Sequence, residues 1–173
     1  MLATRRHEFL ASVRKVLSVP VVIAGSAEEV VRNADILVLC TNSARPVLDG
    51  RWVKEGSCII AIGNATPTTR EVDATTVARS RVVCDSAQAC LVEAGDLLLP
   101  IQEGVIRKDH ITLDLAEILL DPGLGRQNND EVILFKSVGL AFEDIVTAAY
   151  VYSRAISSGD SLTEFDFFAH TAA

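Results

Sequence analysis

Five short apolar runs, separated by stretches with helical character, are the feature of this sequence that most constrains its fold. The runs are PVVIA (20–24), DILVLC (35–40), CIIAI (58–62), RVVCD (81–85) and EVILF (131–135). Runs that are apolar at nearly every position are typical of parallel strands whose two faces are both covered by helices. The alternation therefore predicts an α/β fold with a mostly parallel sheet flanked by helices.

Capping residues mark where the helices between these runs begin. Ser26 and Glu29 have the spacing of a capping box, in which a hydroxyl and a carboxylate satisfy amides at a helix start. Asp73 is a suitable N-cap for the next helix, and Asp85 with Gln88 is expected to cap the one after it. We interpret the N-terminal segment MLATRRHEFLASVRKVL as a surface helix rather than a transit peptide, because it lacks a clear cleavage site.

Glycine and proline mark where the later helices end. Gly95 is expected to close the helix that Asp85 begins, and Pro122 and Gly123 to end a shorter helix over LDLAEILL. The longest helix is predicted over residues 140–157. Its apolar stripe, which is expected to pack against the core, consists of Phe142, Ile145, Ala149, Tyr152 and Ile156.

The composition fits a single domain and argues against several functional classes. The chain has 173 residues, and its 49% hydrophobic against 23% charged residues indicates apolar surface that a partner covers. A net charge of −7 without any basic run argues against a nucleic-acid partner. The apolar runs are far shorter than the roughly 18 residues that span a bilayer, so no membrane segment is expected.

The cysteines and histidines predict no metal site. Four cysteines lack the close paired spacings of zinc sites, and the three histidines are far apart in the sequence. The cysteines are Cys40, Cys58, Cys84 and Cys90. Buried, reduced thiols favour a cytoplasmic location.

Small and hydroxylic residues follow four of the predicted strands. The segments are TNS (41–43), GNATP (63–67), DS (85–86) and KSVG (136–139). In open parallel sheets, ligands bind beyond the carboxyl ends of the strands, so these segments predict a ligand crevice. The alternative is that Thr, Asn, Ser and Gly simply form the turns.

The order and content of these segments resemble those of a known family. The resemblance lies in SAEEVVRNADILVLCTNSARPVLDGRWVKEGSCIIAIGNATPTTREVD, in VVCDSAQACLVEAGDLLLPIQEGVI and in GRQNNDEVILFKSVGLAFED. Over roughly residues 2–155 the chain is similar to the C-terminal two thirds of ornithine cyclodeaminase/mu-crystallin proteins. This NAD(P)-dependent group includes cyclodeaminases, ketimine reductases and some alanine dehydrogenases, and the resemblance implies a Rossmann-type dinucleotide domain.

The resemblance also implies which residues contact an NAD or NADP cofactor. Thr41, Asn42, Ser43 and Gly63 would lie near the ribose and nicotinamide, and Ser137, Val138 and Gly139 would meet the nicotinamide end. Arg5 and Arg6 would fall near the end of a family strand, where an arginine can accommodate the 2′-phosphate of NADP. The alternative for these two arginines is the solvated start of a helix.

Several departures from the family pattern predict lost chemistry. The sequence contains no G-x-G-x-x-G or G-x-G-x-x-A turn for the pyrophosphate, so a dinucleotide is expected to bind weakly or not at all. The chain also lacks a match to the family's N-terminal domain. Ala65 stands where cyclodeaminases have an acid/base Asp, so no catalytic residue is assigned. Nearby Glu71 and Asp73 are interpreted as helix caps rather than replacements.

Two hypotheses follow. The first is an NAD(P)-dependent oxidoreductase/cyclodeaminase domain of this family that is not catalytic as an isolated chain. The second is a non-catalytic small-molecule-binding or oligomeric assembly module derived from it. Residues 1–158 would form a truncated Rossmann-like domain, and residues 159–173 a tail with a short docking helix. An exposed edge at strand 35–40 predicts a homodimer or higher homo-oligomer.

Overall fold

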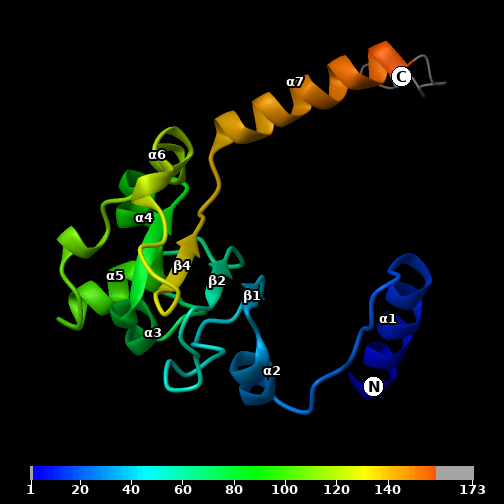
Figure 1. Cartoon of the computed structure of the whole chain (residues 1–173), viewed down its shortest axis with the longest axis horizontal. Coiled ribbons are helices and arrows are strands. Elements are labelled where there is room, and N and C mark those ends of the chain that lie inside the picture. The colour runs from blue at the N-terminus through cyan, green and yellow to red at the C-terminus, as the bar shows by residue number, and fades with distance from the viewer. Residues whose placement is uncertain (1, 159–173) are drawn as a thin grey trace, which may run out of the picture. The chain divides into compact units, whose positions relative to one another are not determined.

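The computed structural model describes residues 2–158, which include every helix and strand named below. Contacts within the chain divide it into two units, residues 1–138 and 139–173, and each is described by itself. The first unit contains a sheet with short helices packed against it (Figure 1). The described part of the second unit is a single long helix.

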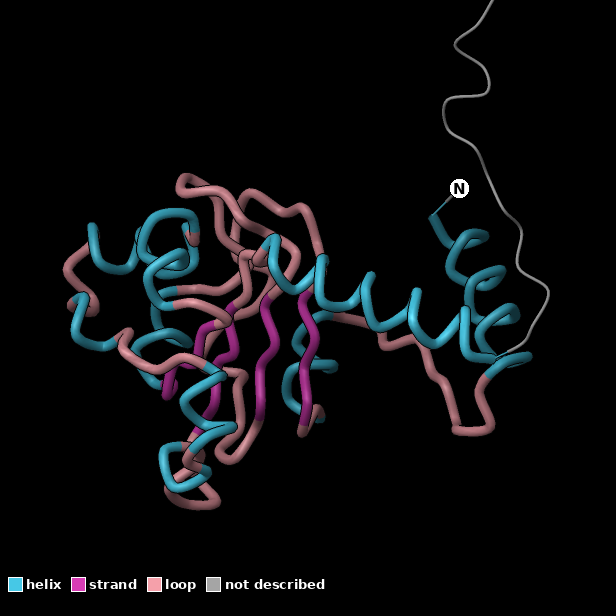
Figure 2. The backbone as a smooth tube through the Cα atoms, turned by 90° about the horizontal axis from the view of Figure 1, so that it is seen from above, coloured by secondary structure: helices cyan, strands magenta, loops and turns pink. Residues whose placement is uncertain are grey.

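Four parallel strands form the sheet (Figure 2). They are β1 (Ile36–Leu39), β2 (Cys58–Ala61), β3 (Ser80–Cys84) and β4 (Val132–Lys136). Their spatial order is β1-β2-β4-β3, so β1 and β3 are the edges and β4 lies inside although it comes last in the sequence. The predicted parallel α/β architecture is confirmed.

One face of this sheet is buried more completely than the other. The register aligns Leu37, Ile59, Leu134 and Val82 across the four strands, and all four are buried. On the opposite face of β1, Ile36 is 66% and Val38 52% exposed. Within the first unit this face of β1 stays exposed, so the prediction that helices cover both faces is wrong there.

Helices α1 to α6 belong to the first unit. They are α1 (Leu2–Val16), α2 (Ala27–Asn33), α3 (Ala74–Arg79), α4 (Ala87–Glu93), α5 (Gly95–Gln102) and α6 (Leu115–Leu120), with 3₁₀ turns η1 (Lys108–His110) and η2 (Pro122–Leu124). Both α3 and α4 pack against α5 and against β3. These three helices supply buried apolar residues such as Val77, Cys90 and Leu97 to the core.

Two predicted N-caps are confirmed. The Ser26 side chain accepts a hydrogen bond from the Glu29 amide at 3.1 Å, and the Asp73 side chain accepts one from the Thr76 amide at 3.2 Å. The Glu29 carboxylate accepts from the amide of Gly25 at 2.7 Å. Side chains thus satisfy amides at the starts of α2 and α3 that have no partner inside the helix.

Two other helix boundaries differ from the prediction. Ser86 is the N-cap of α4 and accepts from the Ala89 amide at 3.2 Å, whereas Asp85 turns towards the segment after β4. Gly95 begins α5 instead of ending α4. A Cβ at Gly95 would lie 2.1 Å from the carbonyl oxygen of Thr69, so glycine is required there by close backbone packing and not by a helix end.

The apolar run 20–24 is not a strand. It has no sheet partner among the described residues, and Val22 is 82% exposed. Instead, a guanidinium nitrogen of Arg14 donates to the carbonyl oxygen of Val21 at 2.7 Å. The strand prediction is wrong because an apolar β-type sequence forms a strand only where a neighbouring strand accepts its backbone hydrogen bonds.

The long helix α7 spans Ala141–Ser158, close to its predicted bounds. None of its residues is buried, and Phe142, Ile145, Tyr152 and Ile156 are each at least 60% exposed. This unit is described by itself, so the packing of the stripe against the core stays a prediction. The predicted docking helix in residues 159–173 lies outside the described residues. No described helix is long and apolar enough to cross a bilayer.

Candidate functional site

The four predicted ligand segments leave the sheet at the same edge, called here the carboxyl edge because all four strands end there. Backbone bonds extend the sheet just past the strand ends: the Ile62 amide donates to Leu39, and the Ser137 amide to Ala61. The amide of Asp85 likewise donates to the carbonyl of Lys136 at 3.1 Å. The parallel register therefore brings segments far apart in the sequence side by side.

A single carboxylate joins the segments after β1 and β2. Glu71 is fully buried, and its Oε1 accepts from the Thr41 amide at 2.6 Å while its Oε2 accepts from the Gly63 amide at 2.9 Å. The prediction that Glu71 caps a helix is wrong, because α3 is capped by Asp73 and the Glu71 side chain points to the strand ends. Glu71 is a bridge between two loops.

Gly63 is required by how closely these loops approach. A Cβ on Gly63 would lie 2.2 Å from both the nitrogen and the oxygen of Thr41, closer than any carbon atom can come. The glycine thus allows the two backbones to pack together at the carboxyl edge.

Asn64 fixes the shape of the loop that follows. Its side chain is 8% exposed, and its Nδ2 donates to the carbonyl of Ser43 at 3.0 Å. Its Oδ1 accepts from the amide of Thr66 at 3.1 Å and from the hydroxyl of Thr69 at 2.8 Å. Ala65 is exposed within this ordered loop, so its methyl group lies at the surface beside the polar residues.

A buried ion pair lies beneath the loop. Lys136, the last residue of β4, has its Nζ 2.9 Å from Oδ2 of Asp96 on α5, and neither side chain has exposed surface. The contact is an ion pair without the alignment of a hydrogen bond. Lys136 Nζ also donates to the carbonyl of Asn64, and Asp96 Oδ1 accepts from the amides of Glu71 and Val72 at 2.7 and 2.9 Å.

Asp85 organises the segment after β4. Its Oδ2 accepts from the Ser137 hydroxyl at 2.7 Å and from the Val138 amide at 2.9 Å, while its Oδ1 accepts from the Ser86 amide at 2.7 Å. One carboxylate therefore links the ends of β3 and β4. Gly139 belongs to the second unit, and its φ of 82° is a left-handed conformation that favours glycine.

The predicted cofactor residues differ in their exposure to solvent. Thr41 and Asn42 are exposed, and Ser43, Gly63, Ser137 and Val138 are half-buried. Hydrogen bonds connect Thr41 to Gly63 through Glu71, and Ser137 to Val138 through Asp85. Arg5 and Arg6 lie within α1 and not at the end of a strand.

Sequence reasoning did not identify Asp96, included Lys136 in the segment KSVG without its buried partner, and misassigned Glu71. The sequence does indicate a buried partner for Lys136, because this lysine directly follows the apolar run EVILF and its charge therefore lies close to the buried sheet. Asp96 lies in GDLLLPIQ, a segment for which no helix was predicted.

Two of the cysteines have a thiol whose pKa is raised. A hydrogen bond with Cys84, together with burial, raises the pKa of the Cys90 thiol, and burial raises the pKa of Cys58. A thiol with a raised pKa carries less of the nucleophilic thiolate at neutral pH, which disfavours a nucleophilic role for both cysteines. Within residues 2–158, no cluster of three or more His, Cys, Asp or Glu is arranged to hold a metal ion.

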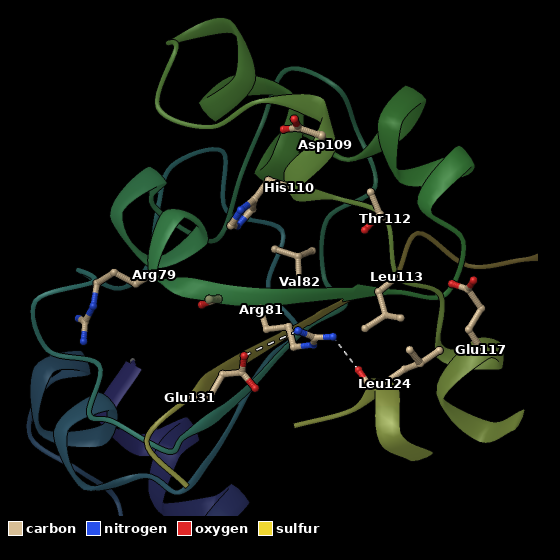
Figure 3. Close-up of a pocket in the computed structure, with 11 residues that line it drawn as sticks. Arg79, Arg81, Val82, Asp109, His110, Thr112, Leu113, Glu117, Leu124 and Glu131 are labelled. Carbon is tan, nitrogen blue, oxygen red and sulfur yellow. Dashed lines mark hydrogen bonds and ion pairs between the residues drawn. The ribbon is translucent and has the colours of Figure 1, made fainter. Parts of the chain in front are cut away.

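A separate pocket of about 630 Å³ lies along the outer edge of β3, near the beginning of the strand (Figure 3). In it, Arg81 donates to the carbonyl of Leu124 at 2.8 Å and lies 3.9 Å from the Glu131 carboxylate. His110 Nε2 lies 3.0 Å from the carbonyl oxygen of Val77. These polar groups already contact protein partners, and the pocket contains none of the residues at the carboxyl edge.

Known proteins match the chain over most of its length. A model of the ornithine cyclodeaminase/mu-crystallin family matches residues 3–159. A Δ¹-pyrroline-2-carboxylate reductase from Bacillus cereus is 35% identical over 156 residues, which cover 90% of this chain and 48% of the relative. An alanine dehydrogenase from Archaeoglobus fulgidus is 33% identical over 131 residues, or 76% of this chain and 40% of the relative.

Solved structures share the fold. The Δ¹-pyrroline-2-carboxylate reductase of Thermococcus litoralis, in complex with NADH and L-proline, superposes with a TM-score of 0.76 at 42% identity, covering 82% of this chain and 44% of that one. An archaeal alanine dehydrogenase dimer with bound NAD superposes with a TM-score of 0.79 at 28% identity, covering 94% and 49%.

The chain spans about half the length of the curated relatives it matches. Its parallel sheet, its Rossmann-like neighbours and the family match over residues 3–159 agree with one another. This protein belongs to the ornithine cyclodeaminase/mu-crystallin family.

Proposed function

We propose that this chain supplies the nicotinamide-facing part of an NAD(P)-dependent reductase, with cyclic imines of amino acids as its substrate class. The observation that supports this most is the convergence of the Thr41, Gly63 and Ser137 segments at the carboxyl edge. The similarity to Δ¹-pyrroline-2-carboxylate reductases supports the substrate class.

The residues at this edge fit one end of a dinucleotide. The exposed side chains of Thr41 and Asn42 offer a hydroxyl and an amide to a ribose or a carboxamide. Gly63 allows the loop that carries it to pack against the Thr41 backbone, which places both loops at this edge. When bound, a reduced nicotinamide supplies a hydride to the imine carbon while the nitrogen takes up a proton.

The fit to the pyrophosphate is poorer. The sequence contains no G-x-G-x-x-G turn, so no such turn offers its amides to the phosphates. Ala65 cannot exchange a proton with a substrate amine. We therefore propose that this chain alone binds a dinucleotide weakly and does not catalyse cyclodeamination.

Calorimetry with NAD, NADH, NADP and NADPH tests this function. We expect saturable binding that weakens in Thr41→Ala and in Ser137→Ala, because each change removes a hydroxyl at the carboxyl edge. Thr112→Ala, which removes an exposed hydroxyl from the pocket beside β3, is the matched control and should bind normally. Absence of any heat with millimolar dinucleotide would refute the proposal.

A second candidate function is an oligomeric assembly module. It is favoured by β1, an edge strand whose Ile36 and Val38 side chains are more than half exposed. Exposed apolar edges pair readily with other chains, and the solved archaeal alanine dehydrogenase is a dimer. Light scattering distinguishes this candidate, since an assembly module should self-associate whether or not it binds a dinucleotide.

A further inference from the structure

The loops after β1 and β2 are held together by one side chain that sequence patterns had suggested was a helix cap. Glu71 is fully buried, and its two oxygens accept from the amides of Thr41 and Gly63 at 2.6 and 2.9 Å. Because each oxygen satisfies a different loop, the carboxylate sets the separation of the loops. A neutral amide in its place would turn an N–H₂ donor towards one of the two N–H groups.

Hydrogen bonds to α5 hold the backbone of the segment that carries Glu71. Asp96 on α5 accepts from the backbone amides of Glu71 and Val72 and pairs with Lys136 at the end of β4. Lys136 also donates to the carbonyl of Asn64, in the loop after β2. The contacts thus run continuously from the loop after β1, through Glu71 and α5, to the end of β4.

Stability alone does not account for this arrangement. Burial of three ionisable side chains carries a desolvation cost, and apolar residues of similar volume often give an equally stable core. Charged groups with fixed hydrogen bonds instead specify geometry. The geometry that they specify here is the relative position of the loops at the carboxyl edge.

We propose that Glu71 is a positioning residue that holds the Thr41 loop and the Gly63 loop in register at the carboxyl edge, where the proposed nicotinamide site lies. Asp96 and Lys136 keep its carboxylate in place. This inference rests on the proposed function and adds to it the residue that holds the binding loops in register. Glu71 acts through the two loop amides and does not itself contact the dinucleotide.

The test compares Glu71→Gln with Val77→Ala, a buried substitution in α3 that leaves the loop contacts intact. Two quantities are measured below the unfolding transition: NADH affinity by calorimetry, and amide hydrogen exchange of Thr41 and Gly63 by NMR. We expect Glu71→Gln to weaken NADH binding about tenfold and to accelerate exchange at both amides. Val77→Ala should lower the melting temperature without changing either quantity.

Glu71→Asp serves as a second variant that keeps the buried charge if Glu71→Gln does not fold. Its side chain is one methylene shorter, so we expect exchange to accelerate at one of the two amides and not at both. Unchanged exchange in the folded variants, or an equal loss of NADH affinity in Val77→Ala, would overturn the inference. If the unmodified chain does not bind NADH or NADPH, the proposed function fails while the exchange rates still decide whether Glu71 positions the loops.

Discussion

Lys136 and Asp96 form an ion pair inside the core, with Nζ 2.9 Å from Oδ2 and no exposed surface on either side chain. Lys136 is the last residue of the interior strand β4, and Asp96 lies in the first turn of α5. The ion pair therefore connects the sheet to α5. A buried charge destabilises the folded protein when its partner of opposite charge is removed.

Lys136→Met is expected to lower the free energy of unfolding by about 3 to 5 kcal/mol, because it leaves the buried Asp96 carboxylate without its cation. The double variant Asp96→Asn/Lys136→Met removes both charges and should recover part of this loss. Urea denaturation followed by circular dichroism measures both values. A double variant that is no more stable than the single one would contradict a paired role.

Gly63→Ala is expected to lower the free energy of unfolding by about 1 to 3 kcal/mol, since the new methyl group would overlap the backbone of Thr41. Gly25→Ala is the control, because its Cβ would meet only the end of the Glu29 side chain, at 3.2 Å. The control should change the stability by no more than about 0.5 kcal/mol. Equal effects of the two substitutions in thermal unfolding would argue against close packing of the loops.

Asp85→Ala is expected to cost about 1 to 3 kcal/mol, because it removes the acceptor for the Ser137 hydroxyl and the Val138 amide. Ser86→Ala removes the adjacent N-cap of α4 and should cost about 1 kcal/mol. Hydrogen exchange separates the two effects: the Val138 amide should exchange faster in Asp85→Ala only. Faster exchange in both variants would mean that general destabilisation explains the change.

The four cysteines are expected to differ in their reaction with iodoacetamide at neutral pH. Cys40 is exposed and should react first, whereas Cys90 is buried, and the hydrogen bond with Cys84 together with burial raises the pKa of its thiol. Peptide mass mapping after brief labelling measures the order. All four should react in concentrated urea, and rapid labelling of Cys90 in the folded protein would contradict its burial.

Self-association through β1 is expected to depend on its exposed apolar face. Light scattering should give a mass above that of the monomer for the unmodified chain, and the monomer mass for Ile36→Lys/Val38→Lys, because two charges would oppose pairing. Leu120→Lys, at an 89% exposed position on α6, is the control and should not change the mass. A monodisperse unmodified monomer at micromolar concentration would rule out this role of the edge.

The sequence predicted the strands of the sheet and the segments at its carboxyl edge well, because both depend on local patterns. Apolar runs around Leu37, Ile59, Val82 and Leu134 are strands in the structure, and Ser26 and Asp73 cap helices as expected. The run at 20–24 has an equally apolar pattern and is not a strand. Pairing decides this difference, and pairing depends on residues elsewhere in the chain.

The residues that hold the candidate site together could not be read from local patterns. Glu71 and Asp85 both stand in the sequence where a helix cap is expected. In the structure, Glu71 accepts from amides in the loops after β1 and β2, and Asp85 accepts from an amide in the segment after β4. A carboxylate accepts hydrogen bonds from the unpaired backbone amides that the fold brings nearest to it. Sequence spacing shows only which amides of the following helix lie within reach, and not the amides that come from other strands or loops.

The sequence by itself thus determined the α/β class, the family and the polar segments that meet at the carboxyl edge, since strand periodicity and short motifs are local properties. Only the tertiary structure decided that Glu71 spans two loops, that Lys136 and Asp96 pair in the core, and that β1 keeps one exposed face. These features depend on which backbone and side-chain groups become neighbours after folding, because a buried charge or amide must find its partner wherever the packed chain provides one.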